Sequence, residues 1–87
     1  MRIVTYDIAD PKRLRKVSKI CGRYLKKVQK SVFEGELTKS QLYTLKEDLK
    51  KEMDESEDNI IIYFVTRPSV KKRITLGKET EDQYIIF

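Results

Sequence analysis

The opening stretch MRIVTYDIADPKRL (residues 1–14) joins a strand to the start of a helix. Its first half is rich in β-branched and aromatic residues, and their alternation places Tyr6 on one face and Asp7 on the other. Asp10 then predicts a helix N-cap, and Pro11 the first helical position. A strongly apolar strand therefore ends in a carboxylate just before a helix begins. The role of this carboxylate has to be inferred from the rest of the sequence.

The remaining elements follow from hydrophobic spacing and from turn and cap residues. Thr38 followed by Gln41 forms a capping-box pattern that starts a second helix. After the strand at residues 2–8, the sequence predicts a helix at 11–23, strands at 25–28 and 29–37, a helix from 39 to about 53, and a strand at 60–66. This βαββαβ order indicates an α+β domain, the ferredoxin-like sandwich, with further short strands at 73–76 and 83–87.

A single domain of 87 residues has a small core, and two helices cover only one face of its sheet. The run at residues 60–65 is nonetheless apolar on both faces, which favours cover on both sides. A second copy of the chain is the simplest second cover, so we expect a homodimer. We divide the domain into a core at residues 1–66 and an extension at 67–87 that pairs with the partner subunit, because 83–87 could complete a neighbour's sheet.

The composition excludes several kinds of site. With no histidine and one cysteine, Cys21, the chain can form no internal disulfide, zinc site or catalytic triad built on histidine. No run resembles a signal peptide or is long enough to span a membrane, so we expect a cytoplasmic protein with no membrane contact. Catalysis would then rest on carboxylates, hydroxyls, tyrosine, lysine or a hard metal ion.

Basic charge is concentrated in one segment. Residues 11–33 contain nine basic side chains and no acidic one, and the whole chain carries a net charge of +5. A charge run is most often a solvated helix face, but this run lacks acids at helical spacing and repels itself unless a polyanion screens it. A nucleic-acid backbone is the usual polyanion, so we expect nucleic-acid contact. The basic residues are Lys12, Arg13, Arg15, Lys16, Lys19, Arg23, Lys26, Lys27 and Lys30.

Three stretches together resemble the CRISPR-associated Cas2 family, small dimeric proteins of spacer acquisition. They are Tyr6-Asp7-Ile8, Asp10-Pro11-Lys12-Arg13-Leu14 and, most specifically, Gln29-Lys30-Ser31-Val32-Phe33-Glu34-Gly35. The resemblance implies a ferredoxin-like homodimer that contacts DNA or RNA and bridges two dimers of the CRISPR integrase Cas1. It also implies a metal-dependent nuclease that acts on single-stranded RNA or on double-stranded DNA.

The resemblance also implies roles for individual residues. It makes Asp7 the catalytic and metal-binding aspartate, with Mg²⁺ as the cofactor. It places Ser31 and Phe33 beside the cleft of the dimer, where Tyr6 is a further candidate. If two chains pack through the face that carries Asp7, the two carboxylates meet in one cleft, and phosphate oxygens can complete a magnesium shell. The residues expected to contact nucleic acid are Arg13, Arg15, Lys16, Lys19 and Lys27.

Each assignment has an alternative. Asp7 could be structural, either by accepting backbone N–H bonds from the following turn or by pairing with Arg13 or Arg15. Phe33 could belong to the core of the dimer, and Tyr6 could pack toward the helices with its hydroxyl at the rim. The chain as a whole could be a purely architectural DNA-binding adaptor without catalysis, or a related toxin-like ribonuclease.

Overall fold

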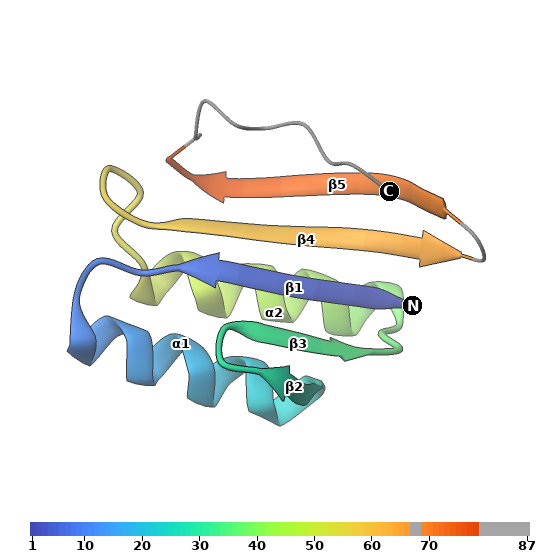
Figure 1. Ribbon diagram of the computed structural model, residues 1–87, viewed down its shortest axis with the longest axis horizontal. Helices are drawn as coiled ribbons and strands as arrows, with labels where there is room; N and C mark the ends of the chain where they lie inside the picture. The colour runs from blue at the N-terminus through green and yellow to red at the C-terminus, as the bar shows by residue number, and fades with distance from the viewer. Residues whose placement is uncertain (67–68, 79–87) are drawn as a thin grey trace.

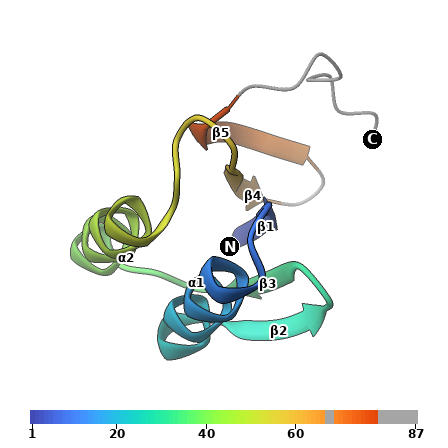
Figure 2. The ribbon, with the colours of Figure 1, turned by 90° about the vertical axis from the view of Figure 1, so that its left-hand side faces the viewer.

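Two helices lie against one face of a five-stranded antiparallel sheet in the computed structural model, which describes residues 1–66 and 69–78 (Figures 1 and 2). In chain order the elements are β1 (Arg2–Asp7), α1 (Pro11–Tyr24), β2 (Lys26–Gln29), β3 (Val32–Gly35), α2 (Lys39–Glu52), β4 (Asn59–Thr66) and β5 (Ser69–Gly77). The strands lie in the order β2-β3-β1-β4-β5. The expected α+β fold is confirmed, and the order of the first four strands is that of a ferredoxin-like sheet. Neither helix of the described residues is long and apolar enough to cross a membrane.

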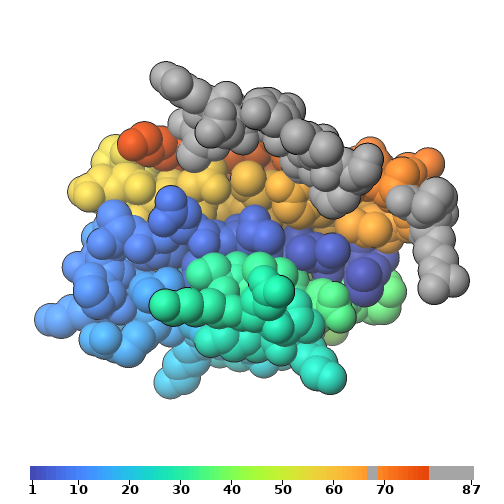
Figure 3. Space-filling model, in the orientation of Figure 1, coloured from blue at the N-terminus to red at the C-terminus, as the bar shows by residue number. Residues whose placement is uncertain are grey.

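β1 is the central strand, and its two faces differ as the alternation predicts. It pairs antiparallel with β3 on one side and with β4 on the other. Val4 is fully buried and Tyr6 is 6% exposed beneath the helices, whereas Asp7 is exposed on the opposite face. Figure 3 looks onto this opposite face, which we call the open face because the helices leave it uncovered.

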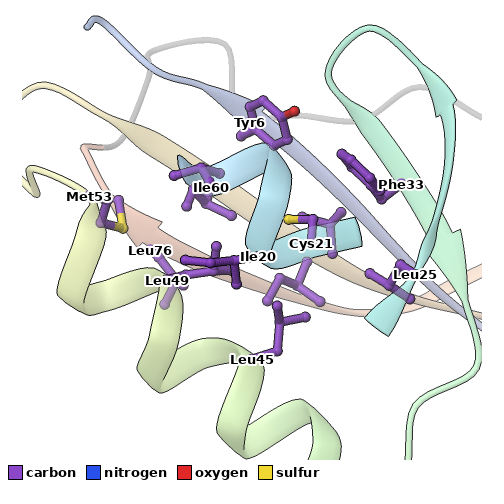
Figure 4. Packing of buried hydrophobic residues seen from close by; sticks show 13 residues of the cluster. Tyr6, Ile20, Cys21, Leu25, Phe33, Leu45, Leu49, Met53, Ile60 and Leu76 are labelled. Atoms are coloured by element: carbon purple, nitrogen blue, oxygen red, sulfur yellow. The ribbon is translucent and has the colours of Figure 1, made fainter. Parts of the chain in front are cut away.

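The hydrophobic core fills the space between the sheet and the helices, where side chains from β1, β4 and both helices meet (Figure 4). Leu45 and Leu49 of α2 and Val17 of α1 are fully buried in it. Cys21 is buried beside them, and burial raises the pKa of its thiol to about 12. Cys21 is therefore a core residue whose thiol stays protonated at neutral pH. Because the thiolate is the reactive form, this cysteine is a packing residue.

Local capping signals define where the helices begin. The Asp10 carboxylate accepts a hydrogen bond of 3.0 Å from the Arg13 backbone N–H, and Pro11 occupies the first helical position. The Thr38 hydroxyl accepts a bond of 3.1 Å from the Gln41 N–H, while the Gln41 side chain accepts one of 2.9 Å from the Thr38 N–H. Both predicted helix starts are thus confirmed, the second as a complete capping box.

Element boundaries differ from the prediction around β2 and β3. α1 continues to Tyr24, past the predicted end at residue 23, and the Leu25 N–H closes it on the Cys21 carbonyl at 2.9 Å. β3 is shorter than the predicted strand at 29–37, because residues 30 and 31 form the turn of the β2–β3 hairpin.

Residues 69–77 form an edge strand of the chain's own sheet. β5 pairs antiparallel with β4 from Asn59↔Gly77 to Thr66↔Ser69. The strand predicted at 73–76 is therefore longer, and this part of the 67–87 extension pairs within its own chain, which corrects the expectation that the extension as a whole pairs with a partner subunit. The strand predicted at 83–87 lies outside the described residues, so its pairing stays a prediction.

Candidate functional site

Asp7 lies at the end of β1, opposite Asn59 of β4, on the open face. Its side chain is exposed, and among the described residues it makes no hydrogen bond or ion pair. The structural alternative, in which Asp7 holds the turn into α1 or pairs with Arg13 or Arg15, therefore has no contact to support it. A free carboxylate at a strand end can instead bind an external cation or a ligand.

The carboxylate that holds this end of the sheet is Asp58, immediately before β4. It is fully buried and accepts hydrogen bonds from the Ala9 N–H at 2.9 Å, the Asp54 N–H at 2.8 Å, and the Arg13 Nε and Nη2 at 2.8 and 3.3 Å. Burial alone would raise the pKa of Asp58, but the Arg13 guanidinium and the two backbone N–H groups hold that pKa below its ordinary value. Asp58 thus binds the turn into α1, and the Asp7 carboxylate takes no part in these contacts.

Asp58 is assigned no role in the sequence analysis. The Ala9 and Arg13 partners lie 49 and 45 residues away along the chain, so no local pattern connects them. The available signal is the position of Asp58 directly before a strand whose next residues are apolar, where a charged side chain needs a partner in order to be buried.

Two of the five basic residues predicted to contact nucleic acid are paired within the chain. Arg13 is held in the ion pair just described and its side chain is 27% exposed, so it has a structural role, and its phosphate contact stays a prediction. Lys16 Nζ lies 3.7 Å from Glu52 Oε2, and the Lys16 side chain is 65% exposed. A solvated pair of this kind contributes little to stability, so Lys16 is available to a phosphate at small cost.

The other three, Arg15, Lys19 and Lys27, line one hollow between α1 and the β2–β3 hairpin. Lys30, from the turn of that hairpin, lines it as well and was not among the five. Among the described residues none of these four cations forms an ion pair. The hollow therefore gathers positive charge without compensating acids, and an anion bound there would relieve the repulsion.

Of the three candidates for a cleft, Tyr6 and Ser31 line this hollow, but Phe33 does not. Phe33 is 2% exposed, and its ring stacks on that of Tyr6 with centroids 6.1 Å apart. It pairs with Val4 in the sheet register, so both side chains point into the core of their own chain. Phe33 is therefore a core residue of its own chain, and its expected place beside a dimer cleft stays a prediction. The expected packing of Tyr6 toward the helices is confirmed, but its hydroxyl is buried and does not lie at the rim.

Asp7 is a candidate ligand for a hard metal ion, because its carboxylate is exposed and has no partner among the described residues. The described residues contain no cluster of three or more carboxylate, cysteine or histidine side chains able to hold one. Magnesium prefers six oxygen ligands and keeps several waters, so a single free carboxylate fits it as one ligand of a shared shell. The remaining oxygens would have to come from water, from a phosphate or from a second copy of the chain.

Residues 1–73, which include all the residues discussed above, match the family described as "CRISPR associated protein Cas2". The chain belongs to the Cas2 family. A protein named "CRISPR-associated endoribonuclease Cas2" from Pyrococcus furiosus is 44% identical over 77 residues, 88% of this chain and 87% of its own. One of the same name from Thermotoga maritima is 39% identical over 85 residues, 98% and 97% of the two chains.

Solved Cas2 structures share the fold. The crystal structure of Streptococcus pyogenes Cas2 at pH 6.5 gives a TM-score of 0.71 at 38% identity, covering 77% of this chain and 87% of that one. Another, titled "Crystal structure of cas2", gives 0.70 at 34% identity and covers 99% and 95%. The resemblance carried by the opening strand and the β2–β3 region is therefore confirmed as Cas2 membership.

Proposed function

We propose that this Cas2 chain forms a homodimer that binds nucleic acid and hydrolyses phosphodiester bonds with Mg²⁺ held at Asp7. The observation that carries the proposal is the difference between two carboxylates at one end of the sheet, those of Asp58 and Asp7. Asp58 is buried and accepts four hydrogen bonds, while Asp7 is exposed at the end of the central strand and has no partner among residues 1–66 and 69–78. The names of the relatives, which are called endoribonucleases, agree with this chemistry.

The residues of the proposed site have separate roles in binding the metal ion and the nucleic acid. Asp7 would bind the metal through a carboxylate oxygen, and the unpaired cations Arg15, Lys19 and Lys27 would bind phosphates of the strand. When bound, Mg²⁺ would neutralise charge on the scissile phosphate and lower the pKa of a coordinated water. The substrate would be single-stranded RNA or double-stranded DNA, and the basic surface itself has no base-reading motif.

The proposed dimer packs through the open face. Half-buried apolar side chains lie there on neighbouring strands, with Ile3 opposite Tyr63 and Thr5 opposite Ile61. β4 is apolar on both faces, and the helices cover only one of them. A partner packed on these side chains would cover the other face. Because Asp7 is on the same face, two copies packed in this way would bring their carboxylates toward one cleft and share a metal shell.

An architectural adaptor is the second candidate function. In that role the basic dimer binds duplex DNA and bridges two dimers of the integrase Cas1 without cutting. The observation that favours it is that the described residues contain no cluster of three or more metal-binding side chains. Each chain then brings one described carboxylate, that of Asp7, to the proposed metal site. Both functions can belong to one protein, since phosphate binding requires no metal, and both place it in spacer acquisition.

The two candidates are separated by measuring binding and cleavage on the same preparation. Sedimentation should give a dimer of the 10.3 kDa chain at micromolar concentration. Single-stranded RNA and duplex DNA are then titrated and incubated with Mg²⁺ or with a chelator. Binding in both conditions with cleavage only in Mg²⁺ supports the nuclease, whereas binding without cleavage of either substrate supports the adaptor. A stable monomer that binds neither polymer contradicts both.

A further inference from the structure

The hollow between α1 and the β2–β3 hairpin has a volume of about 440 Å³, which lies in the range of small-ligand sites. The described residues that line it almost all carry hydrogen-bond donors, and no carboxylate is among these residues. Its lining residues are Arg15, Ser18 and Lys19 from α1, Lys27, Lys30 and Ser31 from the hairpin, with Tyr6 and Leu14. This composition is suited to a compact anion.

The Tyr6 hydroxyl is the second, independent feature of the hollow. Tyr6 is 6% exposed, yet its hydroxyl is a buried oxygen that makes no hydrogen bond with any residue that the structure describes. Ser18 is near enough to lower the pKa of Tyr6, but the two hydroxyls do not meet in hydrogen-bonding geometry. In Figure 4 this oxygen points away from the cluster of buried side chains, on the side of the β2–β3 hairpin. A buried polar group without a partner destabilises a folded protein, which requires an explanation.

The phenol stays a donor over the pH range in which proteins work. A tyrosine hydroxyl carries its proton at neutral pH and can donate it in a hydrogen bond. The protonated hydroxyl can therefore donate to an anion that enters the hollow, and such charge-assisted bonds are stronger than neutral ones.

We propose that this hollow binds a phosphate group of a nucleic-acid strand, with the Tyr6 hydroxyl donating a hydrogen bond to a phosphate oxygen and Arg15, Lys19, Lys27 and Lys30 balancing its charge. The proposal deepens the nucleic-acid binding proposed above and rests on it for the source of the phosphate. Tyr6 and Asp7 are consecutive residues on opposite faces of β1, at the end of this β-strand. A nucleic acid whose phosphate binds in the hollow is therefore held at the end of the sheet that carries the Asp7 carboxylate.

A phosphate explains the lining better than a carboxylate does. An ionised phosphate has only acceptor oxygens toward its surroundings, and the two serine hydroxyls, the phenol and the cations can all donate to them. A terminal phosphate carries up to two charges and three free oxygens, more than the one charge and two oxygens of a carboxylate. An internal phosphodiester carries one charge and two free oxygens, but the neighbouring phosphates of the same nucleic-acid strand bring further negative charge to the four cations. The phosphate in the hollow can therefore be internal or terminal.

The test uses inorganic phosphate as the probe and Tyr6→Phe as the variant, with Tyr43→Phe on the exposed surface of α2 as the matched control. Phosphate is titrated into metal-free protein at constant ionic strength, followed by NMR shifts of the lining amides. Thermal unfolding is measured with and without phosphate. We expect Tyr6→Phe to weaken phosphate binding roughly tenfold or more, because it removes a bond to a charged group. The control should bind phosphate like the wild type.

Stability without phosphate distinguishes a ligand-binding hydroxyl from a structural one. Because the hydroxyl has no partner, Tyr6→Phe should leave the unliganded protein as stable as the wild type or more stable, and it should abolish the stabilisation by phosphate. Lower unliganded stability with unchanged phosphate affinity would overturn the proposal. Lys30→Gln should also weaken phosphate binding, whereas Lys71→Gln, an exposed lysine on β5, should not.

Oligonucleotides with a 5′-phosphate or a 5′-hydroxyl identify the source of the group. Tighter binding of the phosphorylated strand, lost in Tyr6→Phe, assigns a terminal phosphate, while equal weakening of both strands by Tyr6→Phe assigns an internal one. If the wild type binds both strands and Tyr6→Phe and Lys30→Gln change neither, the hollow is not the phosphate site, although the proposed function stands. If the wild type binds no polynucleotide, the proposed function itself fails.

Discussion

Replacing Asp58 by asparagine should unfold the chain far more readily than the same replacement of Asp7. The Asp58 carboxylate receives four hydrogen bonds, all from N–H donors. An asparagine has one acceptor oxygen and an NH₂ group, so at least one donor would face another donor. The Arg13 guanidinium would also lose its counter-charge. Breaking a buried ion pair in this way costs about 3–5 kcal/mol.

Such a loss is a large part of the stability of a small domain, which is about 5–15 kcal/mol. In a domain of this size each kcal/mol shifts the Tm by roughly 4–8 °C, so Asp58→Asn should lower the Tm by about 12 °C or more. Asp7→Asn removes an exposed charge without a partner and should change the free energy of unfolding by less than about 0.5 kcal/mol.

The assay is urea unfolding followed by circular dichroism, at one fixed chain concentration because dimerisation makes apparent stability depend on concentration. Wild type, Asp58→Asn and Asp7→Asn are compared under the same conditions. Equal destabilisation by the two variants, or a change below about 0.5 kcal/mol for Asp58→Asn, would refute the assignment of the structural role to Asp58.

Four further predictions concern the titration of Asp58, two glycines and the salt dependence of nucleic-acid binding. Because the pKa of Asp58 is lowered in the folded state, its stabilisation is complete above the ordinary value of 3.8 and is lost as the pH falls through the folded pKa; acid titration should show this loss in the wild type and a flatter profile in Asp58→Asn. Gly77 has φ +85°, and an added Cβ would meet the Asp58 carbonyl oxygen, so Gly77→Ala should destabilise by at least about 1 kcal/mol in urea. Gly22 is exposed on α1, and an added Cβ would lie 4.0 Å from the Phe33 ring, an ordinary van der Waals contact, so Gly22→Ala should instead stabilise by about 0.5–1 kcal/mol in the same assay. Nucleic-acid affinity should fall steeply with salt and depend little on base sequence in filter-binding titrations, and a strong preference for one sequence at constant salt would contradict contacts made through phosphate.

The fold was predictable because its signals are local. The helix starts at Asp10 and Thr38 use hydrogen bonds between residues three apart, so the residue types at that spacing are sufficient. The exposed face of Asp7 follows from strand alternation, which depends only on position. Strand order then follows from the βαββαβ sequence of elements.

The features that could not be predicted depend on register or on distant partners. Both Val32 and Phe33 are apolar, so alternation alone does not say which faces the helices, and only the pairing of Phe33 with Val4 decides it. The sequence predicts only the second half of β5 as a strand, because its first half carries two exposed lysines, yet an edge strand tolerates such residues on its solvent side. The Asp58 contacts close only when residues far apart in the chain have already come together.

The measurement that tests the central claim most directly is magnesium-dependent cleavage by Asp7→Asn beside Glu57→Gln, a carboxylate-to-amide change at an exposed position outside the proposed site. Both proteins are purified identically, shown to be folded, and incubated with single-stranded RNA and duplex DNA in Mg²⁺ or chelator, while nucleic-acid binding is titrated in parallel. The account predicts that Asp7→Asn loses cleavage but binds nucleic acid as well as the wild type or better, because a negative charge has left the site. Glu57→Gln should cleave like the wild type. Full metal-dependent cleavage by a clean Asp7→Asn preparation would contradict the claim that Asp7 holds the catalytic metal.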